Sequence, residues 1–151
     1  MGEMMDLLKY EIAAEPTLSS LAPIPMQLRQ PERSEILVRI EASSLNFHDF
    51  LVATGGIKAA PGRVPLSDGV GIVEACGPDA SRFQVGDRVM GTFFPDWSRG
   101  TAYAEGVAHM RGDHVDGFAA SMVTMPESGF TRAPAGLDPV AAATLPCAGL
   151  T

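Results

Sequence analysis

The chain of 151 residues contains few cysteines and few basic residues for its length. Its two cysteines, Cys76 and Cys147, cannot build a disulfide framework and cannot by themselves complete a four-cysteine zinc site. Lys and Arg number 11 against 18 Asp and Glu, which gives a net charge of −7. Because there is no cationic surplus to displace counterions from a phosphate backbone, we expect no nucleic-acid partner.

Long hydrophobic runs are also absent. No apolar run approaches the roughly 18 residues needed to span a membrane. The N-terminal ten residues carry Glu3 and Asp6, whereas a signal peptide begins with a basic region followed by an apolar one. We therefore expect no membrane partner and a cytoplasmic location, where reducing conditions suit two unpaired thiols.

What is present fits one globular domain. The hydrophobic content of 46% is enough to build a core, so whole-chain disorder is excluded. Sixteen Gly and twelve Pro are spread along the chain without a repeat. Dispersed Gly and Pro indicate many turns between short elements, which favours a mainly β barrel or sandwich.

Alternating hydrophobic residues predict the strands. The clearest strand covers 35–44, where Ile36, Val38, Ile40 and Ala42 share one face and Arg39, Glu41 and Ser43 share the other. Further strands are expected over 8–12, 68–77, 89–94 and 118–125.

Two short helices are expected from their start signals. The first covers 46–54, with Asn46 as N-cap and Asp49 three residues later as a shortened capping box. The second covers 138–145, because Asp138-Pro139 places a cap before a proline of the first turn. The last six residues indicate the opening turn of another helix, with Thr144 as a possible cap.

The long irregular stretch over 93–116 is the least predictable part, and long loops are often functional. His109, Asp113, His114 and Asp116 could gather a metal ion there, although exposed polar loop residues are the alternative. Gly69-Val70-Gly71 begins like a dinucleotide-binding G-x-G-x-x-G turn, but Glu74 stands at the sixth position and the sequence continues as a strand. These glycines therefore predict a bend in a barrel strand.

Four motifs occur in order: residues 46–49, 65–71, 85–89 and 145–151. Together they resemble the N-terminal half of the medium-chain dehydrogenase/reductase superfamily, specifically its zinc-independent, quinone-reductase-like alcohol dehydrogenase branch. The resemblance covers the chain from about Lys9 to Thr151. It implies a mainly β fold, a GroES-like and partly open β-barrel with a few short helices.

The resemblance also implies a domain plan and an activity. Residues 1–145 would form the GroES-like catalytic, substrate-side domain, and 146–151 would begin the linking helix to a Rossmann domain that is missing from this chain. The full enzyme, a homodimer, would transfer a hydride between NAD(P) and a small-molecule carbonyl, alcohol or enone, or a quinone-like compound. This chain alone is expected to be an inactive fragment. The alternative is a free-standing GroES-like binding or co-chaperone module.

No zinc is expected from this resemblance. The places of two zinc ligands in the zinc-dependent branch resemble Asn46 and the pair Ser67-Asp68 here. Neutral amide and hydroxyl groups bind zinc poorly, because the ion prefers thiolate and imidazole. Cys76 and Cys147 are expected to be buried small hydrophobic residues.

Without zinc, a hydride-transfer site depends on hydrogen-bond donors. By resemblance, Asn46 lies beside the nicotinamide or substrate, where its amide could donate to an oxygen; a plain helix cap is the alternative. His48 lies where relatives place a proton-relay residue and could supply a proton, or could be a partly exposed histidine on a helix. Phe47 could lie near the cofactor or in the core, and Thr151 matches a threonine near the nicotinamide carboxamide.

Phe93, Phe94 and Trp97 cluster where the strand over 89–94 enters the long loop. An apolar wall at that rim would suit a hydrophobic carbonyl or quinone-like substrate. A satellite cluster that packs under the loop is the equal alternative.

Overall fold

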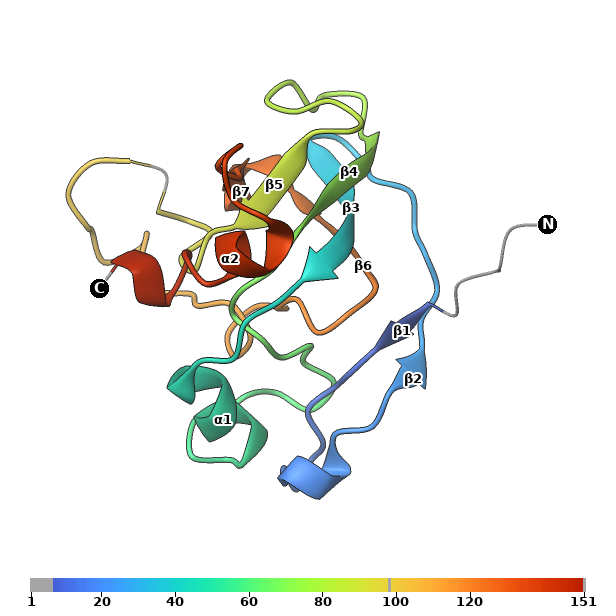
Figure 1. Ribbon diagram of the computed structural model, residues 1–151. Helices are drawn as coiled ribbons and strands as arrows, with labels where there is room; N and C mark the ends of the chain where they lie inside the picture. The colour runs from blue at the N-terminus through green and yellow to red at the C-terminus, as the bar shows by residue number, and fades with distance from the viewer. Residues whose placement is uncertain (1–6, 98, 151) are drawn as a thin grey trace.

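The computed structural model describes residues 7–97 and 99–150, and within these ranges the fold is mainly β, as predicted (Figure 1). The strands are β1 (Leu8–Lys9), β2 (Ile24–Pro25), β3 (Glu35–Ala42), β4 (Val70–Cys76), β5 (Arg88–Gly91), β6 (Met122–Pro126) and β7 (Phe130–Arg132). The helices are α1 (Phe47–Ala53) and α2 (Pro139–Ala143), with short 3₁₀ turns η1 (Leu18–Ser20), η2 (Glu127–Gly129) and η3 (Ala148–Leu150).

The main sheet is antiparallel, and its five strands lie in the order β6-β3-β4-β5-β7. Its two edge strands, β6 and β7, are separated in the chain only by η2, so the sheet curls to bring them near each other. They do not pair with each other, so the barrel stays open between them. The ribbon of β1 and β2 joins this body through an isolated bridge from Lys9 to Ala120. This arrangement is the partly open barrel that the sequence predicts.

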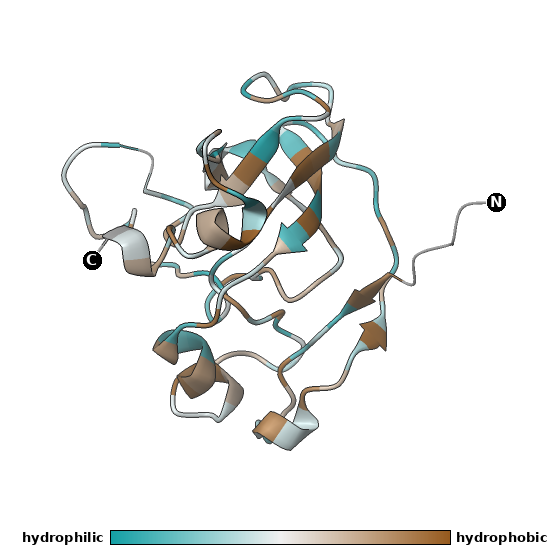
Figure 2. Cartoon of the chain, viewed as in Figure 1, coloured by the Kyte–Doolittle hydropathy of each residue, from teal (hydrophilic) through white to brown (hydrophobic). Residues whose placement is uncertain are grey.

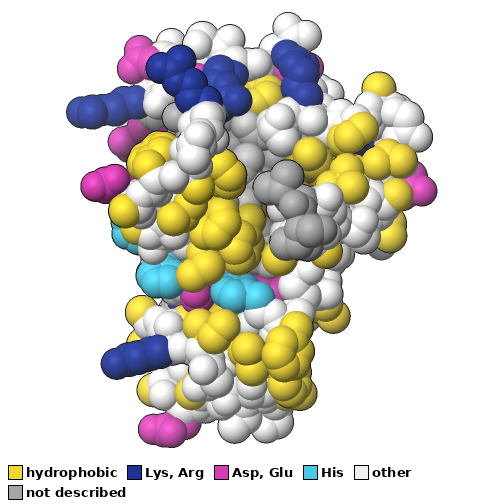
Figure 3. Space-filling model, turned by 90° about the vertical axis from the view of Figure 1, so that its left-hand side faces the viewer, with side chains coloured by type: hydrophobic (Ala, Val, Ile, Leu, Met, Phe, Trp, Pro, Cys, Tyr) yellow, Lys and Arg dark blue, Asp and Glu magenta, His cyan; other side chains and the backbone are white. Residues whose placement is uncertain are grey.

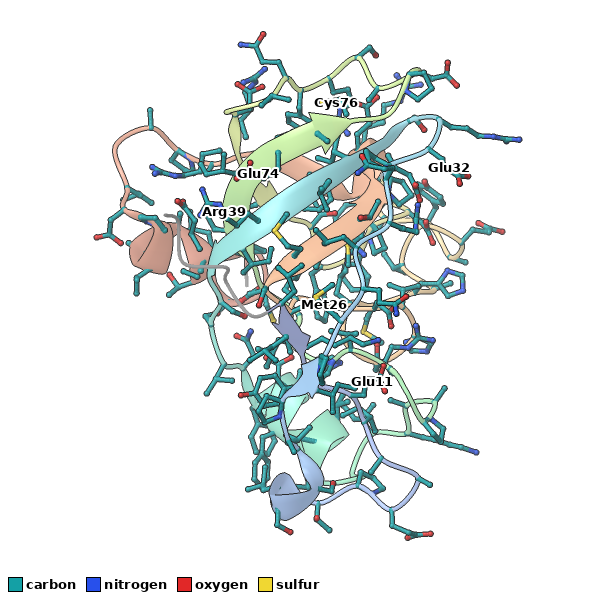
Figure 4. All side chains as sticks on the ribbon, turned by 90° about the vertical axis from the view of Figure 1, so that its right-hand side faces the viewer. Glu11, Met26, Glu32, Arg39, Glu74 and Cys76 are labelled. Atoms are coloured by element: carbon teal, nitrogen blue, oxygen red, sulfur yellow. The ribbon has the colours of Figure 1, made fainter. Side chains whose placement is uncertain are left out.

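Strand β3 has the two faces that its alternation predicts. Ile36 and Val38 are completely buried, and Ile40 packs against the same core cluster. On the outer face, Arg39 donates to Glu74 of β4 at 2.7 Å (Figure 4). Hydrophobic and polar residues accordingly alternate along the strands in Figure 2. The core cluster consists of Ile36, Val38, Val73, Phe83, Val89, Phe118, Val123, Met125 and Phe130.

The core is built around Phe118, whose ring lies against two glycines. A Cβ at Gly69 would lie 2.4 Å from Phe118 Cγ, and a Cβ at Gly91 would lie 2.0 Å from Phe118 Cζ. Real Cβ atoms do not approach other carbons so closely, so both positions require glycine. Gly71 in β4 meets the carbonyl of Arg39 in the same way, which confirms a strand role for the apparent G-x-G motif.

Both helices begin at the predicted residues. Asn46 is the N-cap of α1, and the side chain of Asp138 accepts from the Ala141 N–H at 2.8 Å at the start of α2. Thr144 does not cap a following helix as expected: its hydroxyl donates to the Ala141 carbonyl, which closes the end of α2, and only a 3₁₀ turn follows. The expected strand over 8–12 shortens to β1.

Between β5 and β6 the described part of the chain contains no helix or named strand, as the irregular sequence of 93–116 predicts. This loop projects to one side of the barrel in Figure 1, next to the C-terminal turns. No helix in the described residues is long and apolar enough to cross a membrane.

Candidate functional site

The start of α1 is joined to the segment before β4 by a buried carboxylate, that of Asp49. Its Oδ2 accepts from the Asn46 backbone N–H at 2.8 Å, and its Oδ1 accepts from the Ser67 N–H at 2.8 Å. Burial would raise the pKa of Asp49, but His48 and these two N–H groups together lower it. Asp49 is therefore an ionised residue that fixes the positions of Asn46 and Ser67.

Asp68 forms a second buried carboxylate in the same segment. It accepts from the Asn46 amide nitrogen at 2.8 Å, from Ser44 Oγ at 2.7 Å and from the Cys147 N–H at 3.0 Å. Burial raises the pKa of Asp68, although these three donors act against the shift. The residue thus brings together α1, β4 and the C-terminal turns at one point.

Asn46 has the helix-cap role that the sequence left open, and its side chain also holds Asp68. Its backbone begins the helix, so the cap assignment is confirmed. Its side-chain nitrogen donates to Asp68, with longer contacts of 3.2 Å to Ser67 Oγ and 3.4 Å to Asp49 Oδ2. An amide carries two hydrogens, so one is held firmly by Asp68 and the other is held weakly.

His48 is mostly buried, because only 14% of its side chain is accessible. Nδ1 lies 3.5 Å from Asp49 Oδ1, and Nε2 lies 3.4 Å from Asp113 Oδ2 of the long loop. The carboxylate of Asp49, and then that of Asp113, raise the pKa of His48 against the opposing effect of burial.

An apolar pocket of about 440 Å³ adjoins this polar cluster. The predicted aromatic residues line it together with residues of β5 and the C-terminal turns, among them Met90, Phe93, Phe94, Trp97, Leu145 and Pro146. Phe93 also packs edge-to-face on His48, with ring centroids 5.4 Å apart. Leu145 and Pro146 directly precede Cys147, which donates to Asp68. Phe93 and the segment 145–147 therefore connect the pocket with the polar cluster, although Asn46, His48 and Asp68 do not line the pocket themselves.

Figure 3 shows this side of the molecule, where hydrophobic side chains gather next to histidines. The three predicted aromatic rings form a continuous series: Phe93 and Phe94 have centroids 4.8 Å apart, and Phe94 and Trp97 have centroids 6.4 Å apart. Another hollow of about 460 Å³ lies beside β6, and Arg29 and Lys9, which line it, are each paired with a glutamate. None of the predicted site residues lines that hollow.

Phe47 lies outside the core, so the core alternative for this residue is wrong. Its side chain is 74% exposed and stacks on Phe50, with ring centroids 5.9 Å apart. The buried face of α1 instead consists of Asp49, Val52 and Ala53, because Asp49 must reach the Ser67 N–H. Thr151, the other residue expected near the cofactor, lies outside the described residues.

The polar residues of the long loop have different neighbours and do not converge on one point. His109 pairs with Asp96 at 2.8 Å, His114 with Asp113 at 3.0 Å, and Asp116 with Arg63 at 2.9 Å. Across residues 7–97 and 99–150, no three His, Cys, Asp or Glu side chains gather in a way that could hold a metal ion.

The groups around Asn46 fit zinc poorly. They supply the Asn46 amide and the Ser67 hydroxyl, which bind zinc poorly, and only the Asp68 carboxylate and the Cys147 thiol are of the types found in zinc sites. Burial, and then the charges of Asp68 and Asp49, raise the pKa of the Cys147 thiol. The Asp68 oxygens already accept three hydrogen bonds.

Sequence reasoning missed several members of this site, among them Asp68, Cys147 and Asp113. Cys147 was expected to be a buried hydrophobic residue, yet its backbone anchors Asp68; the motif of residues 145–151 was the signal that could have placed it. Asp113 was considered only as a metal ligand, and nothing local in the sequence points to His48 as its partner.

Comparisons with known proteins agree with this architecture. A family model described as the alcohol dehydrogenase GroES-like domain matches residues 32–135. A zinc-type alcohol dehydrogenase-like protein of Schizosaccharomyces pombe is 34% identical over 133 residues, which cover 84% of this chain and 38% of that protein.

Solved structures give the same result. A Sinorhizobium meliloti protein described as an alcohol dehydrogenase matches 98% of this chain and 45% of its own, with 37% identity and a TM-score of 0.84. An NAD-dependent alcohol dehydrogenase matches 92% of this chain and 43% of its own, with 26% identity and a TM-score of 0.78. The chain spans less than half the length of each of these three relatives.

Proposed function

The chain belongs to the family of alcohol dehydrogenase GroES-like domains, and we propose that it forms the substrate-side domain of a zinc-independent, NAD(P)-dependent oxidoreductase. The reaction would move a hydride between nicotinamide and the carbon of a carbonyl, alcohol or enone. One observation carries this proposal: the Asn46–Asp68 cluster of hydrogen-bond donors and acceptors adjoins an apolar pocket. A carbonyl compound needs both, because its oxygen must be held while its hydrocarbon part leaves water.

The pocket indicates the class of substrate. Phe93, Phe94 and Trp97 offer aromatic surface, and Met90 and Leu145 add aliphatic surface. A compound with an aromatic or branched apolar group beside its reacting carbon would bury that group here. A highly charged substrate would find no buried counter-charge among these side chains.

Asn46 would hold the reacting oxygen. Its firmly held hydrogen donates to Asp68, which fixes the orientation of the amide. Its second hydrogen has only contacts of 3.2 Å and 3.4 Å, so a substrate oxygen at a normal distance of about 2.9 Å would form the better bond. Such a donor stabilises the negative charge that develops on the oxygen during hydride transfer.

His48 would manage the proton. A carbonyl that accepts a hydride becomes an alkoxide, which must take up one proton to give the alcohol. Asp49 and Asp113 raise the pKa of His48 and so favour its charged form, which could give one proton and become neutral imidazole. In the oxidative direction the neutral ring would take that proton back.

The cofactor chemistry would come from bound NAD(P), which supplies or accepts the hydride. Phe47 next to Asn46 presents an exposed aromatic ring that suits contact with a planar ring, and we propose Asn46, Phe47 and Thr151 as the residues on the cofactor side. A second domain would bind the pyrophosphate, and the relatives, which are more than twice as long as this chain, support its presence. A cytoplasmic location suits the two free thiols. The homodimer belongs to the same proposal.

The test is hydride transfer by the protein expressed from its complete coding sequence. NADH or NADPH carrying deuterium at both C4 positions would be incubated with aromatic ketones and enones, and the products examined by mass spectrometry. The proposal predicts one deuterium per product, with a kcat at least tenfold lower in Asn46→Ala than in the control Asp79→Ala, whose side chain is exposed. Absence of transfer to every carbonyl tested would contradict the proposal.

A further inference from the structure

Two buried polar groups from distant parts of the chain face each other with no hydrogen-bond partner of their own among the described residues. They are the His48 ring nitrogens on α1 and Asp113 Oδ2 in the loop between β5 and β6. The Asp113 side chain is completely buried, and His48 Nε2 lies 3.4 Å from its free oxygen. Buried polar atoms are expensive to leave unpaired, so this pairing needs an explanation.

We propose that Asp113 is the positioning residue for His48: it holds the imidazole charged and oriented, and through it fastens the pocket-lining loop to helix α1. The pairing of Asp113 with His48 does not depend on the proposed function. Only the effect of this pairing on turnover rests on the proposed function.

The charge pairing explains the unpaired atoms. Asp49 Oδ1, which also accepts from the Ser67 N–H at 2.8 Å, lies against Nδ1 of the imidazole, so it leaves Nε2 for Asp113. A neutral imidazole donates from only one nitrogen, whereas the imidazolium offers a proton to both carboxylates. Asp113 therefore completes a carboxylate–imidazolium–carboxylate arrangement in which each charge has an opposite neighbour within about 4 Å.

The other side of Asp113 is fixed by its own loop. Its Oδ1 accepts from the His114 backbone N–H at 2.5 Å and lies 3.0 Å from His114 Nδ1. Arg63 Nε donates to the Asp113 carbonyl at 3.1 Å, while the Arg63 guanidinium pairs with Asp116. The groups around His48 are thus Asp49 and Asp113 in direct contact, and Asp68, His114 and Arg63 behind them.

The same ring links the ion pair to the substrate pocket. His48 and Phe93 pack edge-to-face with an interplanar angle of 85°, and Phe93 continues into Phe94 and Trp97. Phe93 is thus in direct contact with the ring whose charge Asp113 supports. A change in the charge of His48 therefore alters the surroundings of a residue in the pocket wall.

The direct test is an NMR titration of the three histidines in this chain and in two variants. Asp113→Asn removes the proposed partner, and Asp116→Asn removes a neighbouring loop carboxylate that pairs with Arg63 and does not face His48. We expect Asp113→Asn to lower the pKa of His48 by about 1 unit and Asp116→Asn to change it by less than about 0.3. Equal pKa values for His48 in the two variants would overturn the proposal.

A measurement on the unmodified chain covers the case in which Asp113→Asn fails to fold. The ring signals of Phe93 and Trp97 should shift with pH at the midpoint of His48, and that midpoint should lie above the ordinary value of about 6.5. Aromatic signals that do not follow the His48 titration would contradict the coupling.

The kinetic consequence separates this inference from the proposed function. In an enzyme that transfers hydride, Asp113→Asn should move the pH profile of kcat to lower pH with little change in KM, and Asp113→Glu should restore part of the shift. If hydride transfer is absent but the pKa of His48 still falls in Asp113→Asn, the proposed function fails and this inference stands. An unchanged pH profile in an active Asp113→Asn enzyme would show that Asp113 has a structural role only.

Discussion

The Asn46 amide nitrogen lies 2.8 Å from Asp68 Oδ2, and this contact joins the N-cap residue of α1 to the segment that leads into β4. It orients the side chain that we propose for holding a substrate oxygen. It is also one of the three hydrogen bonds that the completely buried Asp68 carboxylate accepts.

The first prediction concerns this carboxylate. Asp68→Ala leaves the Ser44 hydroxyl, the Asn46 amide and the Cys147 N–H without their acceptor. We expect the free energy of unfolding in urea to fall by about 3 kcal/mol, because each orphaned, partly buried donor costs about 1 kcal/mol. The exposed control Asp79→Ala should change it by less than about 0.5 kcal/mol. Equal stability of the two variants would show that the network carries little energy.

The second prediction tests the packing around Phe118. Gly91→Ala places a methyl group 2.0 Å from the ring, so the ring or strand β5 must move. We expect a loss of about 2–3 kcal/mol in thermal or urea unfolding. Gly136→Ala is the matched control, since nothing lies within 4 Å of the added methyl. A stable Gly91→Ala protein would mean that the Phe118 side chain has room to shift.

The third prediction is a pH dependence of stability. Asp49, and then Asp113, raise the pKa of His48 in the folded chain. The imidazolium therefore contributes its full stabilisation below about pH 6.5, the unfolded value, and this contribution is lost as pH rises through the higher folded pKa. Urea unfolding between about pH 5.5 and 8 should show this decline, and His48→Gln should remove it. A His48→Gln protein with the same decline would assign it to another group.

The fourth prediction concerns the pocket. The chain has a single tryptophan, Trp97, so its fluorescence reports on a ligand bound beside Phe94. A neutral aromatic ketone such as acetophenone should quench it in a saturable way. Phe94→Ala should weaken that binding about tenfold, which corresponds to about 1.4 kcal/mol. Val85→Ala, at an exposed position outside the pocket, should leave the Kd unchanged. Linear, unsaturable quenching in the unmodified chain would argue against a binding pocket.

The sequence predicted those parts of the fold that local patterns determine. The alternation of Ile36, Val38 and Ile40 marks the buried face of β3, and Asp138-Pro139 marks the start of α2. The three-residue strand β7 was missed, because so short a segment has no measurable period and forms only through pairing with β5. The ribbon strand β2 was missed for the same reason, in a segment rich in proline.

Tertiary context decided the rest of the site. Phe47 has the spacing of a core residue but is exposed, because the α1 face that turns inward carries Asp49, which accepts from the Asn46 and Ser67 N–H groups. The pairing of His48 with Asp113 depends on how the long loop folds back over α1, which no local periodicity encodes. The aromatic cluster was predicted as a group, but its neighbours Met90 and Leu145 come from separate elements.

Turnover without metal would test the zinc-independent reaction directly. The protein expressed from its complete coding sequence would be dialysed against a strong chelator, analysed for zinc by elemental analysis, and assayed for NAD(P)H-dependent reduction of an aromatic ketone or enone. The donor set around Asn46 predicts far less than one zinc per chain and undiminished turnover after chelation. One tightly bound zinc per chain, with activity that disappears on its removal and returns on its addition, would contradict the account.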